Sequence, residues 1–326
     1  MGTNDKQAKY TLLPMVPPWA DLTLDSELME KVLDASRRLS RLDGFVSSLP
    51  DRDYYVRAIV YREAKTSCAL DGLRKTNVIV NKYQDLLLNE SANISGGKRL
   101  TEETLLNIYS ELRSGLGAGR FKNKVVEAQT MTFLTQFINN TYNIPKDPLF
   151  RMCMVQYQFE ATQPFENGDG RAGRLINILY LIQEGLLTQP CLCLSGCFIR
   201  HPNAYCEAVK SVSVSKDWRQ WVMHVLQSIC CASESTMELI RRIQALKEKI
   251  EDIIRQNGLQ LDRMDASVLL SIPYISPRKL MSGSIKSVNT AKKYLGQLEQ
   301  LGILSKTRAG KEYVWINTEL MSILSE

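Results

Sequence analysis

The segment 163–174, Gln-Pro-Phe-Glu-Asn-Gly-Asp-Gly-Arg-Ala-Gly-Arg, runs directly into an apolar stretch. Gly168 and Gly170 allow a tight backbone turn, and leucines and isoleucines at helical spacing predict that a helix begins there. A turn that opens a helix presents unpaired N–H groups and the positive end of the helix dipole, to which Arg171 and Arg174 add two guanidinium groups. The segment therefore predicts an anion site at a helix N-terminus, and a helix entry with two surface arginines is the alternative.

With its flanks this segment resembles the signature of the Fic (Fido) family, His-Pro-Phe-x-Asp/Glu-Gly-Asn-Gly-Arg-x-Gly-Arg, and residues 156–161 resemble the family's lead-in. The resemblance implies a mainly α fold with a Fic-type helical-bundle core, and transfer of AMP from ATP to a hydroxyl of a target protein, with ATP and Mg²⁺ as cofactors. In typical members the glycine-rich turn and the arginines hold the phosphates. The resemblance thus makes these residues candidates for binding nucleotide or phosphate: Gly168, Asp169, Gly170, Arg171 and Arg174.

Three departures from the signature fall on the chemistry. Gln163 stands where the family has its catalytic His, and an amide is a poor proton acceptor, so the rate should fall by roughly 10² to 10⁴. Asn167 replaces the metal-binding carboxylate, and a neutral amide binds magnesium poorly. Asp169 adds a negative charge to the phosphate loop, which a bound metal would offset. Glu166 or Asp169 could supply a carboxylate to the metal, but the proton stays unassigned, which favours a pseudoenzyme.

A second segment, 63–72, resembles the inhibitory helix found before many Fic domains, Ser/Thr-x-x-x-Glu-Gly/Asn. There the glutamate pairs with the motif's last arginine and occupies the space of the ATP γ-phosphate. Ser67 and Gly72 fit this pattern, whereas Asp71 replaces the glutamate and reaches roughly 1.5 Å less far. The resemblance predicts an Asp71–Arg174 pair, and a simple helix-ending Asp-Gly is the alternative.

Two further regions bear on the resemblance. The stretch 114–124 is too short for the hairpin flap with which typical members clamp their target, which is a second indication that target modification is lost. Residues 194–199 followed by Tyr205 resemble the segment that walls the adenine, but the family's Asn-Arg pair is absent and Cys206 replaces its second Tyr. Tyr205 remains a candidate to stack on a base, and His201 is expected to be an ordinary surface or capping histidine.

The composition limits the remaining alternatives. No run of eighteen apolar residues and no signal-peptide core is present, which predicts a cytoplasmic protein without a membrane partner. A net charge of +6 permits an acidic partner such as nucleotide or nucleic acid. The eight cysteines are expected to be reduced thiols. A metal cluster at Cys191, Cys193 and Cys197 lacks any Cys-x-x-Cys pair, so buried small side chains are the favoured interpretation.

Apolar periodicity outlines the helices. It predicts helices over 25–42 and 51–67, ended by Gly44 and Gly72, and further helix over 73–112 around a polar loop at 89–98. A long amphipathic helix is expected over 235–256.

The last part of the chain is expected to be a small separate domain. Short helices at 263–271, 277–281 and 287–301 precede a β-hairpin at 303–316, and this order resembles a winged helix-turn-helix. Between 257 and 326 there are nine Lys and Arg against six Asp and Glu, a weak positive footprint. Protein contact or homodimerisation is the alternative to DNA binding. The candidate DNA-binding residues are Ser287, Asn289, Thr290, Lys292 and Lys293 on the recognition helix and Arg308 and Lys311 on the wing.

The sequence thus predicts a mainly α protein with four parts: an N-terminal arm and helices carrying the inhibitory-type segment (1–95), a Fic core (96–232), a linking helix (233–258) and a winged helix-turn-helix (259–326). The favoured function is a degenerate Fic protein that responds to nucleotide or phosphate and acts as a regulatory or DNA-binding module. One alternative is an active adenylyltransferase with an unknown protein target, self-inhibited through Asp71. The other is an interaction scaffold with neither ligand.

Overall fold

The computed structural model describes residues 25–73, 77–113, 132, 134–139, 147–162, 169–259, 263–281, 285–309 and 312–326. Within these ranges the side chains of 113, 160–162, 169, 263–266 and 309 are not described. The N-terminal arm and the stretch 114–124 lie outside the described residues, and so do these candidate site residues: Gln163, Glu166, Asn167, Gly168 and Lys311.

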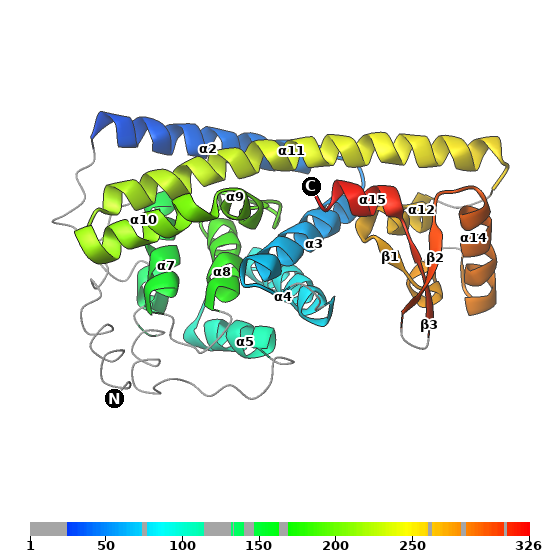
Figure 1. Cartoon of the computed structure of the whole chain (residues 1–326), viewed down its shortest axis with the longest axis horizontal. Coiled ribbons are helices and arrows are strands. Elements are labelled where there is room, and N and C mark those ends of the chain that lie inside the picture. Colours follow the sequence, from blue (N-terminus) through cyan, green and yellow to red (C-terminus); the bar gives the residue numbers. More distant parts are fainter. Residues whose placement is uncertain are drawn as a thin grey trace.

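Two long helices, α2 (Ser26–Ser47) and α11 (Trp218–Gln256), pack along one edge of the molecule (Figure 1). The Asp25 side chain caps α2 by accepting a hydrogen bond from the Leu28 N–H at 2.8 Å. The expectation that Gly44 ends α2 is wrong, because the apolar stripe continues to a buried Val46. Burial against α11 outweighs the cost of about 1 kcal/mol for a glycine inside a helix.

Helix α11 is longer than the sequence indicated. The amphipathic pattern over 235–256 is its second half, and its first half begins at Trp218, where Asp217 caps the helix by accepting from the Gln220 N–H at 3.1 Å. Trp218 and Trp221 are fully buried in the helical core. At 39 residues α11 extends for about 58 Å and connects the core to the C-terminal domain (Figure 1).

The core surrounds α8 (Asp169–Gln183), which packs against helices on several sides: α3 (Arg52–Leu70), α4 (Asn77–Ser95), α5 (Glu102–Arg113) and α7 (Pro148–Thr162). Every α8 residue from Arg171 to Ile182 is buried, as expected for a helix in the middle of a core. The polar stretch that was expected to be a loop from 89 onward continues α4 as far as Ser95, because Ser91 and Ile94 are buried. Two further helices, α9 (Ser195–Arg200) and α10 (Pro202–Ser215), lead from α8 to α11.

The C-terminal domain combines short helices with a small sheet. Its elements follow in this order: α12 (Arg263–Ser271), β1 (Tyr274–Ile275), α13 (Pro277–Leu280), α14 (Val288–Gln300), β2 (Ser305–Ala309), β3 (Glu312–Ile316) and α15 (Thr318–Ile323). The antiparallel sheet has the order β1-β3-β2, with Tyr274 opposite Ile316 and Ser305 opposite the same residue on the other side. The sequence missed β1 and α15, which are too short to show a period. The fold is mainly α with a small C-terminal α+β domain, which confirms the predicted class (Figure 1).

Within the described ranges, none of the helices combines the length and the apolar character needed to cross a membrane.

Candidate functional site

Polar side chains from α3 and α8 meet inside the helical core. Glu63 and Ser67 on α3 and Asp71, the residue that caps its C-terminal end, follow one another at intervals of four, which places them along one side of the helix. On α8 the buried Arg171 and Arg174 lie three residues apart, again on one face. Because α3 packs against α8, the two polar stripes face each other in the middle of an apolar bundle.

Asp71 forms ion pairs with both arginines. Its Oδ1 lies 2.8 Å from Nη2 of Arg174, and its Oδ2 lies 3.3 Å from Nε of Arg171. Arg174 also donates from Nε to the Ser67 hydroxyl at 2.8 Å and from Nη2 to the Ser67 carbonyl at 2.9 Å. The Asp71–Arg174 pair that the sequence predicted is thus present, and Arg171, three residues earlier, shares the same carboxylate.

The end of α3 sets the position of the Asp71 carboxylate. Gly72 has a φ of 77°, in the left-handed region that favours glycine, and its N–H donates to the Ala69 carbonyl at 3.0 Å. The Leu73 N–H closes the cap on the Cys68 carbonyl, also at 3.0 Å. The helix-ending Asp-Gly, which was the alternative interpretation, is therefore also present, and the same cap directs Asp71 toward α8.

Two glycines of α8 allow this close approach. A Cβ on Gly170 would lie 2.6 Å from Nη1 of Arg174 and 3.0 Å from Oδ1 of Asp71. A Cβ on Gly173 would lie 2.9 Å from the Cβ of Phe159 on α7. Gly170 thus leaves room for the ion pair, and Gly173 brings α7 and α8 together.

Asp71 is a carboxylate that both arginines share. Arg171 and Arg174 are 1% and 3% exposed, and Asp71 supplies one carboxylate to the two guanidinium groups. Among the described residues, Nη1 of Arg171 is a buried donor without a hydrogen-bond acceptor. The first turn of α8 lies beside it, and a helix N-terminus favours negative charge. This arrangement suits a second anion such as a phosphate group.

A buried carboxylate, Glu63, lies behind the arginines. It is fully buried and accepts from the Ser195 N–H at 2.9 Å and from the Ser195 hydroxyl. Burial raises the pKa of Glu63, and these hydrogen bonds and the nearby Arg174 charge only partly oppose that effect. The sequence reasoning missed Glu63, although its spacing from Ser67 and Asp71 is a signal that could have identified it.

The candidate base-stacking residue, Tyr205 on α10, is partly buried in an aromatic cluster. Its ring centroid lies 4.7 Å from that of Phe198 and 5.7 Å from that of Trp221. Its hydroxyl accepts from Nε2 of Gln156 at 3.1 Å, and Gln156 in turn accepts from Asn177 of α8. Tyr205 is therefore tied by a polar chain to the same helix that carries the arginines. The sequence reasoning missed Asn177, which continues the three-residue spacing of Arg171 and Arg174.

Other side chains considered for special chemistry have ordinary surroundings. His201 is exposed at the start of α10, as expected for a surface histidine. Cys191 and Cys193 are buried, consistent with small apolar side chains. Within the part of the chain that is described, no three His, Cys, Asp or Glu side chains come together as metal ligands.

The candidate DNA-binding residues of α14 form an exposed face. Ser287 caps the helix by accepting from the Thr290 N–H at 3.1 Å. The five predicted residues at its N-terminal end are all exposed: Ser287, Asn289, Thr290, Lys292 and Lys293. Arg308 on β2 is also exposed, but it lines a cavity of about 290 Å³ between the C-terminal domain and helices α3 and α4. The structure thus groups the α14 residues and places Arg308 toward the core.

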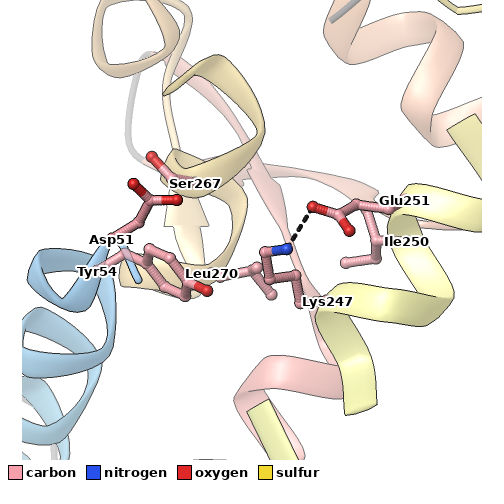
Figure 2. Close-up of a pocket in the computed structure, with 7 residues that line it drawn as sticks. All are labelled: Asp51, Tyr54, Lys247, Ile250, Glu251, Ser267 and Leu270. Carbon is pink, nitrogen blue, oxygen red and sulfur yellow. Dashed lines mark ion pairs between the residues drawn. The ribbon is translucent and has the colours of Figure 1, made fainter. Parts of the chain in front are cut away.

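A second cavity lies where α3, α11 and α12 meet, and Figure 2 shows the side chains around it. Its volume of about 10 Å³ is close to the minimum for one water molecule. Lys247 and Glu251 form an ion pair on its α11 side. This cavity belongs to the junction between core and C-terminal domain and is too small for a nucleotide.

Comparisons with known proteins agree with this architecture. Residues 29–106 match a family model described as Fic/DOC family N-terminal, and residues 246–320 match one described as Protein adenylyltransferase SoFic-like, C-terminal domain. A crystal structure of a Fic family protein from Desulfovibrio desulfuricans G20 superimposes with a TM-score of 0.53 at 15% identity, and the alignment covers 91% of this chain and 97% of that one. The molecule therefore has a Fic-type helical fold. The two model matches and the shared fold support a Fic (Fido) domain protein.

Proposed function

We propose that this chain is a degenerate Fic protein whose two α8 arginines form a phosphate site closed by Asp71, and that it acts as a nucleotide- or phosphate-responsive regulatory module rather than as a typical AMP transferase. Gln163 at the position of the family's His, and Asn167 and Asp169 at two further motif positions, support the loss of transfer chemistry.

The observation that carries the proposal is the carboxylate shared by Arg171 and Arg174. Phosphate oxygens and carboxylate oxygens bind guanidinium groups in the same way. Asp71 thus occupies a position that a phosphate oxygen would take. Nη1 of Arg171, which has no acceptor among the described residues, supports a site that can take a further negative charge. An incoming phosphate group must displace Asp71 or share the arginines with it.

Calorimetric titration of ATP with magnesium tests this proposal. Binding should tighten in Asp71→Ala, because the competing carboxylate is removed, and should be lost in Arg174→Ala. Asp252→Ala, on the exposed face of α11, removes one negative charge far from the arginines and should bind as the wild type does. Equal binding by the wild type and Asp71→Ala would show that Asp71 does not occlude the site. No binding in any variant would support the scaffold alternative.

The active-enzyme alternative is supported by the same Asp71–Arg174 ion pair. An inhibitory-type side chain that contacts the last arginine of the motif is consistent with an enzyme that is autoinhibited. Incubation of Asp71→Ala with labelled ATP and magnesium distinguishes the two functions. Transfer of label to the protein itself or to a lysate protein, abolished by Gln163→Ala, would establish the enzyme. Nucleotide binding without transfer would support the degenerate protein.

A second candidate function, DNA binding by a C-terminal winged helix, is favoured by the exposed polar face at the start of α14. Fluorescence anisotropy with duplex DNA at low salt should detect binding that weakens as salt rises. Lys292→Ala combined with Lys293→Ala should weaken binding and lower the salt slope by about 2, since each lysine would neutralise one phosphate. Absence of binding at low salt would leave protein contact or homodimerisation as the role of this domain.

A further inference from the structure

Two cysteines from different helices lie in direct contact. Cys197 belongs to the short helix α9 and Cys231 to the long helix α11, 34 positions further along the chain. Their sulfur atoms are 2.7 Å apart, and both are free thiols. A disulfide bond is about 2.05 Å long, so a further approach of roughly 0.7 Å would join them.

A cation lies beside both sulfur atoms. Nη2 of Arg200 is 3.1 Å from the sulfur of Cys197 and 3.2 Å from that of Cys231. The guanidinium is held in place by a hydrogen bond from Nε to the Gly196 carbonyl at 3.1 Å. A guanidinium this close can stabilise negative charge that develops on a sulfur atom as it reacts.

The two thiols differ in their access to solvent. Cys231 is half-buried and lines an open pocket of about 440 Å³. The lining also holds three basic side chains, two acidic ones and the neighbouring thiol: Lys31, Arg38, Arg200, Asp34, Glu234 and Cys230. Cys197 lies behind it and is buried, and burial raises the pKa of its thiol. A small oxidant can therefore reach Cys231 first, with Cys197 already in contact behind it.

We propose that Cys197 and Cys231 are a peroxide-sensitive thiol pair that closes to an intramolecular disulfide between α9 and α11. The Cys231 sulfur attacks one oxygen of hydrogen peroxide, the O–O bond breaks, and a sulfenic acid and one water form. The Cys197 sulfur then attacks the Cys231 sulfur and displaces the hydroxyl group, which leaves as a second water with the Cys197 proton. Two thiols and one hydrogen peroxide thus give one disulfide and two waters, and both sulfurs are oxidised as the peroxide is reduced.

The neighbouring Cys230 is a poor competitor for this reaction. It is buried, and its sulfur lies 3.5 Å from the Asp34 carboxylate rather than beside Arg200. Burial and the Asp34 charge together raise the pKa of Cys230 to about 11. A disulfide between Cys197 and Cys231 would join α9 covalently to α11. Helix α9 also carries Ser195, which donates to Glu63, and Phe198, which contacts the Tyr205 ring.

Thiol titration and peptide mapping test the proposal directly. The full chain carrying Cys206→Ser, which removes the exposed thiol, retains seven of the eight cysteines. After treatment with stoichiometric hydrogen peroxide its free thiols should fall from seven to five, a peptide pair linking Cys197 to Cys231 should appear, and dithiothreitol should restore all seven. The melting temperature should rise on oxidation, because a loop of the chain is closed.

Variants separate this pair from its neighbours. Cys231→Ser, at a half-buried position, should abolish the linked peptide, whereas Cys230→Ser should leave it unchanged. Arg200→Gln should slow the oxidation several-fold without preventing it. Retention of all seven thiols, or a disulfide that links Cys230 or any other cysteine, would overturn the proposal.

Discussion

Helices α8 and α14 each carry two cationic side chains near the N-terminal end, but those of α8 are buried and those of α14 are exposed. On α8, Arg171 and Arg174 are buried within the core and paired with a carboxylate from another helix. On α14, Lys292 and Lys293 are exposed on a helix that buries only its opposite face. A buried cation requires a fixed anionic partner, whereas water suffices for an exposed one. Substitutions on α8 should therefore affect stability far more than substitutions on α14.

The largest effect is expected at Arg174. Replacement by alanine removes three hydrogen bonds to Ser67 and Asp71. Among the described residues, the partly buried Asp71 carboxylate then keeps its ion pair with Arg171. The free energy of unfolding should fall by about 3 kcal/mol. Chemical denaturation measures it, and Arg174→Lys, which keeps the charge but not the planar fork, should recover only part of the loss. A loss below about 1 kcal/mol for the alanine variant would contradict a structural role for the buried pair.

One glycine in α8 and one in α14 test how tightly each helix is packed at that position. Gly173→Ala should destabilise the protein by about 1 to 2 kcal/mol, because its Cβ would lie 2.9 Å from the Cβ of Phe159 and the gain in helix propensity only partly offsets the clash. Gly296→Ala in α14 is the matched control, since nothing lies within 4 Å of its Cβ. It should stabilise the protein by about 0.5 to 1 kcal/mol. Thermal melts should show a lower melting temperature for Gly173→Ala and a higher one for Gly296→Ala.

Because Glu63 is buried beside the α8 arginines, the free energy of unfolding should depend on pH. Burial raises the pKa of Glu63 above its ordinary value of 4.5. As pH rises above 4.5, the unfolded state therefore loses the Glu63 proton while the native state still holds it. The free energy of unfolding should then decline with pH, by up to about 1.4 kcal/mol per unit, until the raised pKa is passed. Glu63→Gln should remove this decline in denaturation curves recorded between pH 4 and pH 8. Glu248→Gln, at an exposed position on α11, is the control and should retain it.

The smallest effect on stability is expected at the two α14 lysines. Lys292→Ala and Lys293→Ala remove exposed side chains, so each should change the free energy of unfolding by less than about 0.5 kcal/mol. Chemical denaturation of the double variant checks this, and it also shows that any loss of DNA binding does not arise from unfolding. A double variant that loses more than about 1 kcal/mol would mean that α14 contacts more than the structure shows.

Local signals in the sequence were sufficient for much of the fold. The glycine-rich segment followed by an apolar run placed the start of α8, and Asp-Gly at 71–72 placed the end of α3. Period and turn residues gave the C-terminal helices and hairpin within a few residues. They failed at Gly44 and at the start of α11, where contact between α2 and α11 extends helices beyond their local limits.

By itself the sequence determined the mainly α class, the C-terminal α+β domain and the expectation that Asp71 meets Arg174. Only the tertiary structure decided that Arg171 shares that carboxylate, that Glu63 is buried behind it and that Cys197 touches Cys231. The physical reason is that periodicity reports which face of a helix is buried but not what it is buried against. Asp71 and Arg174 are 103 positions apart, and their contact exists because α3 and α8 pack together.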